Sequence, residues 1–221
     1  MKNLTKIILT ISLPIFVLLM VFQQAVFDLS YFKNKFVEND TPAVTGLDME
    51  QLMRVSEQTL EYLKDKRDDL IIYEELNGEK IQVFKDREIE HMVDVKDLFV
   101  MGYTIRNITG IISLLSIAYL WMKHKKSILQ SVRMGSVLFF GLIAIIGSYA
   151  VLDFNHAFTI FHELLFTNDL WLLNPETDIM IQMLPLDFFM GIGLKIAVIY
   201  MAYLVLSVVS TTILLRKRMS N

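Results

Sequence analysis

Long apolar runs alternate with polar connections along this chain. Four runs of about 19 to 25 residues are each long enough, at about 1.5 Å per residue, to cross a hydrocarbon core of about 30 Å as a helix. They are roughly Ile7–Phe27, Gly102–Met122, Met134–Leu152 and Gly191–Leu215. Only helices and closed barrels satisfy their backbone in lipid, and continuous apolar runs favour helices. The pattern therefore predicts an α-helical integral membrane protein with four transmembrane helices.

The connection between the first two runs, residues 28–101, has the periodicity of a small folded cap. Ser30–Gly46 is predicted as a polar connector with a turn at Asn39-Asp40-Thr41-Pro42. Asp48–Asp69 is predicted as an amphipathic helix, with Thr45-x-x-Asp48 resembling a capping box. The residues on its apolar side are Leu52, Val55, Thr59, Leu60 and Leu63.

The segment IIYEELNGEKIQVF predicts a β-hairpin, because its central Asn77-Gly78 favours a type I′ turn. The connection is therefore expected to form a small α+β cap of about 70 residues. A cap of this size holds only a small core alone. We expect it to dock on the bilayer face or on the second long connection.

No helix breaker separates Arg87 from the second apolar run, so one helix is expected to start in the cap and to enter the membrane. At i, i+3 and i+4 spacing one face carries several side chains together. These are His91, Asp94, Val95, Leu98 and Gly102. Tyr103 and Arg106 are expected three to four turns below His91.

The connection between the last two runs, residues 153–190, is expected to hold two short interfacial helices. Phe154–Phe166 is predicted as the first helix, lying in or dipping into the interface. Asn174-Pro175 is a helix-start signal, and the second helix is expected to end near Pro185. The expected organisation is thus helix 1 in residues 1–27, the cap in 28–101, and helices 2–4 with this outer segment in 102–221.

Charge predicts which sides of the membrane these segments face. The N-terminus, the 123–133 loop and the tail carry nine basic residues and no acid: Lys2, Lys6, Lys123, Lys125, Lys126, Arg133, Arg216, Lys217 and Arg218. Positive charge favours the cytoplasmic side, so both termini are expected inside the cell and residues 28–101 and 153–190 outside. The first run has no small-residue cleavage site after it and is interpreted as a retained anchor.

Composition excludes several classes of function. The mean hydropathy is +0.47 and 54% of the residues are hydrophobic, which indicates a membrane protein. Beside this pattern the basic clusters do not indicate nucleic-acid binding. The chain has no cysteine, which excludes disulfides and thiolate catalysis.

The stretch Asp153–Phe189 is the strongest candidate for chemistry. It holds two of the four histidines, His156 and His162, and six of the acids. A plain loop between two membrane helices would not require this mixture of side chains. Polar groups placed at membrane depth are costly and mark functional sites by default. A third histidine on the same side is His91, whereas His124 lies among cytoplasmic lysines. A single interfacial histidine is most often structural, but three on one side favour function.

Simpler interpretations remain beside this one. His162-Glu163 begins like a metalloprotease motif but lacks the second histidine four residues on, so a metal site is not predicted. Ser30 and Ser56 lie in no setting that exposes a nucleophile. The outer aromatic residues fit either an interfacial belt or an acyl-chain pocket. They are Phe99, Tyr103, Phe154, Phe158, Phe161, Phe166, Trp171, Phe188 and Phe189.

At two segments the chain resembles the bacterial lipoprotein intramolecular transacylases (Lit). The first is EHMVDVKDLF, Glu90–Phe99, and the second is FHELLFTNDLWLLNPETDIMIQMLPLDFF, Phe161–Phe189, with the spacing F-H-x3-F-x-N-D-x-W-x2-N-P-x2-D. The resemblance implies four membrane helices with an extracytoplasmic cap between helices 1 and 2. It also implies a substrate, a diacylglyceryl lipoprotein in the cell membrane. The reaction would move its sn-2 acyl chain to the α-amino group of the N-terminal cysteine.

The resemblance further implies two catalytic histidines where cap and membrane meet. Carried over by motif, these are His91 and His162, with His156 in reserve. Residues assigned to substrate binding or to orienting a histidine are Asp94, Tyr103, Arg106, His156, Asn168, Asp169, Trp171, Asn174 and Asp178. Histidine would act as acid and base without a covalent intermediate, and no metal, nucleotide or acyl carrier is required.

Two rival functions stay open at this stage. One is a non-catalytic sensor or assembly subunit whose outer cap binds a partner. The other is a metal-dependent membrane hydrolase, which chelators would stop.

Overall fold

The chain divides into two compact units in the computed structural model. The model describes the backbone of residues 1–220 and the side chains of residues 1–217, so the side chain of Arg218, counted above with the basic tail, lies outside the described residues. The first unit comprises residues 1–25, 102–153 and the chain from residue 193 onward. The second unit comprises residues 26–101 and 154–192. The cap and the second outer connection therefore belong to the same unit.

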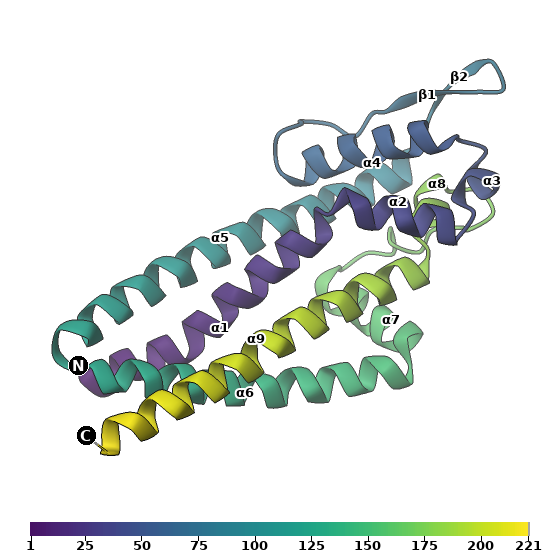
Figure 1. Ribbon diagram of the computed structural model, residues 1–221. Coiled ribbons are helices and arrows are strands. Elements are labelled where there is room, and N and C mark those ends of the chain that lie inside the picture. Colours follow the sequence, from purple (N-terminus) through teal and green to yellow (C-terminus); the bar gives the residue numbers. More distant parts are fainter. Residues whose placement is uncertain (221) are drawn as a thin grey trace. The chain divides into compact units, whose positions relative to one another are not determined.

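The first unit consists of four helices (Figure 1). They are α1 (Lys2–Val26), α5 (Asp86–Lys123) from Gly102 onward, α6 (Lys125–Leu152) and α9 (Leu186–Ser220) from Gly193 onward. All four helices are long and apolar enough to cross a membrane, which confirms the four predicted spans. Helix α6 begins at Lys125, nine residues before the predicted apolar run, because the polar residues of this stretch are compatible with a helix.

Small residues and a proline allow the helices of the first unit to approach closely. Pro14 lies inside α1 and has no N–H, so the carbonyl of Thr10 loses its usual helical donor. That carbonyl is where a Cβ on Gly135 of α6 would lie at 2.4 Å, so only glycine fits this crossing. The fully buried Tyr200 of α9 donates its hydroxyl to the carbonyl of Pro14 at 2.9 Å. The same stretch of α1 thus holds both α6 and α9.

The second unit combines short helices with one hairpin around a shared hydrophobic core. Its elements are α2 (Leu29–Glu38), α3 (Thr41–Thr45), α4 (Met49–Leu63), β1 (Tyr73–Leu76), β2 (Glu79–Gln82), the start of α5, α7 (Phe154–Leu165), α8 (Ile179–Met183) and the start of α9. Strands β1 and β2 pair antiparallel, with Tyr73 opposite Gln82. Asn77 and Gly78 both have positive φ, as a type I′ turn requires, so the predicted hairpin is confirmed.

The prediction of a polar connector over residues 30–46 is wrong, because α2 and α3 occupy most of it. Phe32 and Phe36 are spaced i, i+4 and are both buried in the core, which stabilises α2. The side chain of Asp28 accepts a hydrogen bond from the N–H of Ser30 and caps the start of this helix. The predicted turn is present, with Asp40 in the left-handed conformation.

Helix α4 confirms the predicted amphipathic helix but differs at both ends. Its capping box joins Asp48 and Gln51 and not Thr45 and Asp48, since Gln51 N–H donates to Asp48 and the Gln51 side chain accepts from Asp48 N–H. The helix ends at Leu63 and not at Asp69, because Asp65 takes a left-handed backbone conformation with φ of 58°. All five predicted apolar-face residues are buried.

In the second outer connection, the first predicted helix is confirmed as α7, and the second is wrong at its start. Asn174 does not cap a helix. Its side chain accepts from the N–H of Glu176 at 2.9 Å, and its own N–H donates to the side chain of Asp178 at 2.8 Å. These bonds close a turn on itself, so the following helix, α8, begins only at Ile179.

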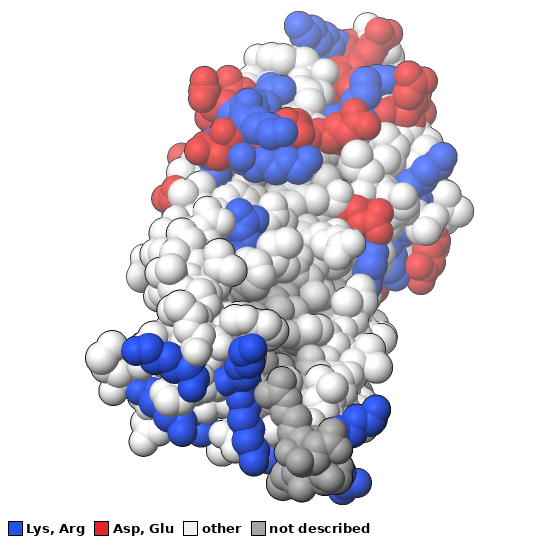
Figure 2. Space-filling model, turned by 60° about the vertical axis from the view of Figure 1, so that its left-hand side comes forward, with Lys and Arg blue, Asp and Glu red and all other residues white. Residues whose placement is uncertain are grey.

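Charge differs between the two units. On the face in Figure 2, one group of basic side chains gathers at one end of the molecule and has no acidic side chain among it. Acidic and basic side chains are mixed over the second unit (Figure 2), where ion pairs such as Arg54 with Glu74, at 2.8 Å, form.

Candidate active site

Two histidines from distant parts of the sequence meet inside the second unit. His91 lies on the first turns of α5, before its membrane-spanning part, and His162 lies on α7. Their ring centroids are 6.1 Å apart. Both side chains are buried, with exposed fractions of 8% and 7%. The fold therefore brings together the two imidazoles that the sequence singled out.

Aromatic rings enclose His162. Phe158 lies one turn before it with ring centroids 4.2 Å apart, and Trp171 stacks on it at 4.8 Å with an interplanar angle of 28°. Phe166 lies 5.6 Å from His162 and 5.3 Å from His91, so one ring contacts both imidazoles. These rings shield the histidines from water.

Hydrogen bonding distinguishes the two rings. Nδ1 of His162 lies 2.7 Å from the carbonyl oxygen of Phe158. A carbonyl only accepts, so in the neutral ring Nδ1 carries the proton and Nε2 keeps a lone pair. Nδ1 of His91 is buried and has no hydrogen-bond partner among the described residues. A buried nitrogen without a partner is costly, so its presence in a folded protein calls for an explanation.

Burial keeps both imidazoles neutral. It lowers the pKa of His91 to about 4, an effect that the nearby His162 strengthens and the carboxylate of Asp94 opposes. Burial also lowers the pKa of His162, against the opposing effect of its hydrogen bond to the Phe158 carbonyl. Both rings are therefore unprotonated near neutral pH and able to accept a proton.

Other predicted residues lie around this pair in the second unit. Asn168 donates to the carboxylate of Asp94 at 2.8 Å, and both belong to the predicted site. The backbone carbonyl of Asp169 accepts from the guanidinium of Arg87, so Asp169 is held by its main chain. These contacts connect the turn after α7 to α5.

Three predicted residues have other surroundings. Asp178 is buried and accepts from Lys85 at 3.0 Å, while its bond from the N–H of Asn174 contributes most to lowering its pKa. Asn174 and Asp178 thus have partners within their own turn, which favours a structural role. His156 is exposed on the first turn of α7, away from the enclosed face that carries His162.

Tyr103 and Arg106 belong to the first unit. The guanidinium of Arg106 lies over the ring of Tyr103, 5.4 Å from its centroid. It donates to the side chain of Gln23, and at 2.8 Å to that of Asn107. Both of these hydrogen-bond acceptors are neutral amide side chains.

Sequence reasoning missed Glu88, which is fully buried one turn before His91. The sequence signal was weak. A carboxylate at the third position of a helix indicates a capping box only when the N-cap residue is Ser or Thr, and Lys85 is the residue before this helix. It also missed the bond from His162 to the carbonyl four residues earlier, which depends on the side-chain rotamer.

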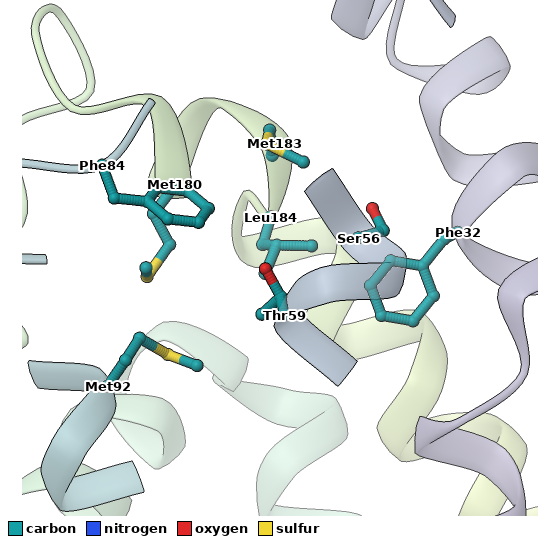
Figure 3. A pocket seen from close by; sticks show the side chains of 8 residues that line it. All are labelled: Phe32, Ser56, Thr59, Phe84, Met92, Met180, Met183 and Leu184. Atoms are coloured by element: carbon teal, nitrogen blue, oxygen red, sulfur yellow. The ribbon is translucent and has the colours of Figure 1, made fainter. Parts of the chain in front are cut away.

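A cavity of about 20 Å³ lies inside the second unit (Figure 3). Phe32, Met92 and Met183 are among its lining residues, and neither histidine is. Ser56 and Thr59 also line it, but their hydroxyls donate to carbonyls of their own helix. A space of this size holds about one water molecule and no acyl chain. Within residues 1–217, no three His, Asp or Glu side chains lie close enough together to hold a metal ion.

Comparisons with known proteins identify the family of this chain. The family model described as "Lipoprotein intramolecular transacylase Lit" matches residues 7–189. A solved structure of the membrane-integral Lit from Bacillus cereus is similar over 100% of this chain and 99% of its own, with a TM-score of 0.86 and 22% identity.

Two further structures of the Bacillus cereus protein, in which a histidine is replaced by arginine or by alanine, are also similar. Their TM-scores are 0.79 and 0.80, with 23% and 21% identity. The two matches cover 100% of this chain, and 95% and 96% of the chains in those structures. At these identities the structures show a shared fold. No curated protein sequence matches the chain significantly. The family model covers most of the chain, and on that ground the chain belongs to the lipoprotein intramolecular transacylase Lit family, membrane-integral acyltransferases that act on lipoproteins.

Proposed function

We propose that this protein moves the sn-2 acyl chain of a diacylglyceryl lipoprotein to the α-amino group of its N-terminal cysteine, leaving a lyso-form lipoprotein. The observation that carries the proposal is the pair of buried, neutral imidazoles 6.1 Å apart inside an aromatic enclosure. An acyl shift from oxygen to nitrogen needs a proton acceptor near the amine and a proton donor near the leaving oxygen. Two histidines of this kind are suited to both tasks.

The reaction forms one bond and breaks another. The neutral amine attacks the ester carbonyl, and the carbon–nitrogen bond of the amide forms. The carbon–oxygen bond to the glyceryl group then breaks. The nitrogen loses one proton and the glyceryl oxygen gains one, so the net change needs no other reactant. Because both groups belong to one substrate molecule, positioning alone can contribute roughly 7–11 kcal/mol.

Hydrogen bonding supports a division of work between the histidines. With Nδ1 of His162 bonded to the Phe158 carbonyl, Nε2 has the lone pair that accepts the proton from the amine. His91 has a buried Nδ1 without a partner, which a substrate group would satisfy. In this proposal His91 steadies the oxyanion or passes a proton to the glyceryl oxygen. A direct transfer of this kind has no covalent intermediate.

The surroundings of the pair fit an acylated substrate at a membrane. Phe158, Phe166 and Trp171 offer apolar surface for acyl chains, and Asp94 with Asn168 offers polar groups at its edge. On the same proposal the histidines work at the extracytoplasmic face, as the distribution of basic residues predicts. Contact of Tyr103 and Arg106 with the substrate stays a prediction from the sequence.

The deciding experiment expresses the chain in a bacterial host that lacks lipoprotein N-acylation. Mass analysis of the N-terminal peptide of a reporter lipoprotein should show one acyl chain on nitrogen and one on the glyceryl group. His91→Ala and His162→Ala should each reduce conversion by at least about 100-fold, since general acid–base catalysis contributes about 10²–10⁴.

The matched control is His124→Ala, which removes the histidine between α5 and α6 and should leave conversion unchanged. An unaltered diacylglyceryl cysteine, with the unmodified protein shown to be present in the membrane, would contradict the proposal. Full conversion by both the His91 and the His162 variants would contradict the assignment of the pair.

A further inference from the structure

Glu88 is the most deeply buried acidic side chain in the second unit, with an exposed fraction of 0%. One carboxylate oxygen accepts from the backbone N–H of Lys85 at 2.8 Å, immediately before α5. The other accepts from the backbone N–H of Met180 at 2.7 Å, in α8. One side chain therefore joins two helices that are about ninety residues apart in sequence. A buried charge of this kind is stable only when it has such partners.

Both bonds need a carboxylate. The two oxygens of an ionised carboxyl accept hydrogen bonds and donate none. A glutamine of the same shape would keep one acceptor and would point an amide N–H₂ at one of the two backbone N–H groups. A donor facing a donor forms no bond and leaves a buried group without a partner. Replacing Glu88 by glutamine thus leaves one of the two buried N–H groups without its acceptor, while it preserves the size of the side chain.

The segment that Glu88 attaches carries one of the rings that enclose His162. Residues 168–180 run from the turn after α7 into α8 and carry Trp171, which stacks on the His162 ring. Three further side chains near the start of α5 bind the same segment. Lys85 binds Asp178, Arg87 binds the carbonyl of Asp169, and Asp94 accepts from Asn168. Among these four, Glu88 alone is fully buried.

We infer that Glu88 is a positioning residue for the proposed reaction: its carboxylate fixes segment 168–180 to the start of α5 and thereby holds Trp171 against His162. The inference rests on the proposed function for its effect on catalysis. Its structural part concerns only the contact between Trp171 and His162, and the two parts are measured separately.

The stacked tryptophan provides the readout. The chain has two tryptophans, so a Trp121→Phe background leaves Trp171 as the single fluorophore. A protonated imidazole in contact with an indole quenches its fluorescence. Acidifying the purified protein should therefore dim Trp171 as His162 takes up a proton, and His162→Ala should abolish this response and so calibrate it.

In the same background, Glu88→Gln should lose most of the acid-dependent quenching and reduce conversion of the reporter lipoprotein by at least tenfold, while the circular dichroism of the helices stays unchanged. The matched control is Glu90→Gln, an exposed carboxylate two residues later on the same helix. It should retain both the quenching and the conversion.

A folded Glu88→Gln protein with full quenching would overturn the inference whatever its conversion, and full conversion with lost quenching would overturn the catalytic part. If Glu88→Gln does not fold, Glu88→Asp decides by the same criteria, because it keeps the charge but is one methylene too short to reach both N–H groups. Absence of conversion by the unmodified chain, with normal quenching, would refute the proposed function and leave the positioning role standing.

Discussion

The behaviour of His91 and His162 follows from where the chain places their rings. Each ring is buried among apolar and aromatic groups, which disfavours the charged imidazolium. At the same time, only His162 has a fixed hydrogen bond through Nδ1. Two side chains of the same type thus acquire different properties from a single neighbouring carbonyl.

The first residue-scale prediction concerns protonation. In ¹⁵N-histidine NMR spectra of the detergent-solubilised protein, His91 should stay neutral down to a pH of about 4, whereas an unperturbed histidine titrates near 6.5. His162 should also titrate below 6.5, because burial lowers its pKa. Titration of both buried rings at or above 6.5 would show that water reaches them and would contradict the enclosure described above.

The same shift has a consequence for stability. The folded pKa of His91 lies below the unfolded value, so the unfolded chain binds more protons between pH 6.5 and about 4. The contribution of this neutral ring to stability is complete above pH 6.5 and is lost as the pH falls towards 4. Thermal unfolding at pH 7 and pH 5 should therefore show a smaller loss of stability for His91→Leu than for the unmodified chain.

At the scale of elements, close backbone approach decides how α1 and α6 pack. A Cβ at Gly135 would lie 2.4 Å from the carbonyl oxygen of Thr10, which is backbone and cannot rotate away. Gly141 of the same helix has nothing within 4 Å of such a Cβ. The two glycines therefore form a natural pair for comparison.

Gly135→Ala should destabilise the protein by about 1–3 kcal/mol, the usual cost of forcing extra atoms into a packed site. Gly141→Ala should be neutral or slightly stabilising, because alanine favours a helix. Unfolding in a denaturing detergent, followed by circular dichroism, measures the difference. Equal effects of the two substitutions would contradict the close crossing.

A second element-scale prediction concerns the start of α4. Asp48→Ala removes the side chain that caps this helix and should reduce the free energy of unfolding of the second unit by about 1 kcal/mol. Asp48→Asn should keep most of the stability, because asparagine is an equally good cap. Hydrogen exchange of the α4 amides provides the measurement, and unchanged protection in Asp48→Ala would refute the capping role.

At the scale of the whole molecule, the uneven distribution of basic residues predicts the orientation in the membrane. Nine basic residues and no acid occur in the two termini and the 123–133 loop. The absence of cysteine makes the test direct, since any introduced thiol is the only one in the protein.

A cysteine introduced at Lys126, in the inner loop, should react with a membrane-impermeant maleimide only after the cells are permeabilised. A cysteine at Glu79, in the exposed hairpin, should react in intact cells. The reverse pattern would invert the predicted topology and would place the candidate active site on the cytoplasmic face.

Local sequence patterns correctly predicted the elements that depend only on residues close together in the chain. Apolar runs predicted the four membrane helices, and Asn77-Gly78 predicted the hairpin, because length, hydropathy and turn preference act over a few residues. The same local logic misjudged Asn174, where a side chain closes a turn on itself and no helix starts. It also overlooked α2, whose helical spacing of Phe32 and Phe36 was obscured by the polar residues between them.

The histidine pair could be named from the sequence, but its geometry could not. The motifs singled out His91 and His162 as separate residues 71 positions apart, and only the packing of α7 beside α5 brings their rings to 6.1 Å. The role of Glu88 could not be predicted from the sequence for the same reason, since its second partner is a backbone N–H in α8. Short-range preferences are encoded along the chain, whereas contacts between remote segments depend on how a shared hydrophobic core is filled. The sequence alone thus determined the membrane character and the candidate chemistry, and the tertiary structure decided which groups meet.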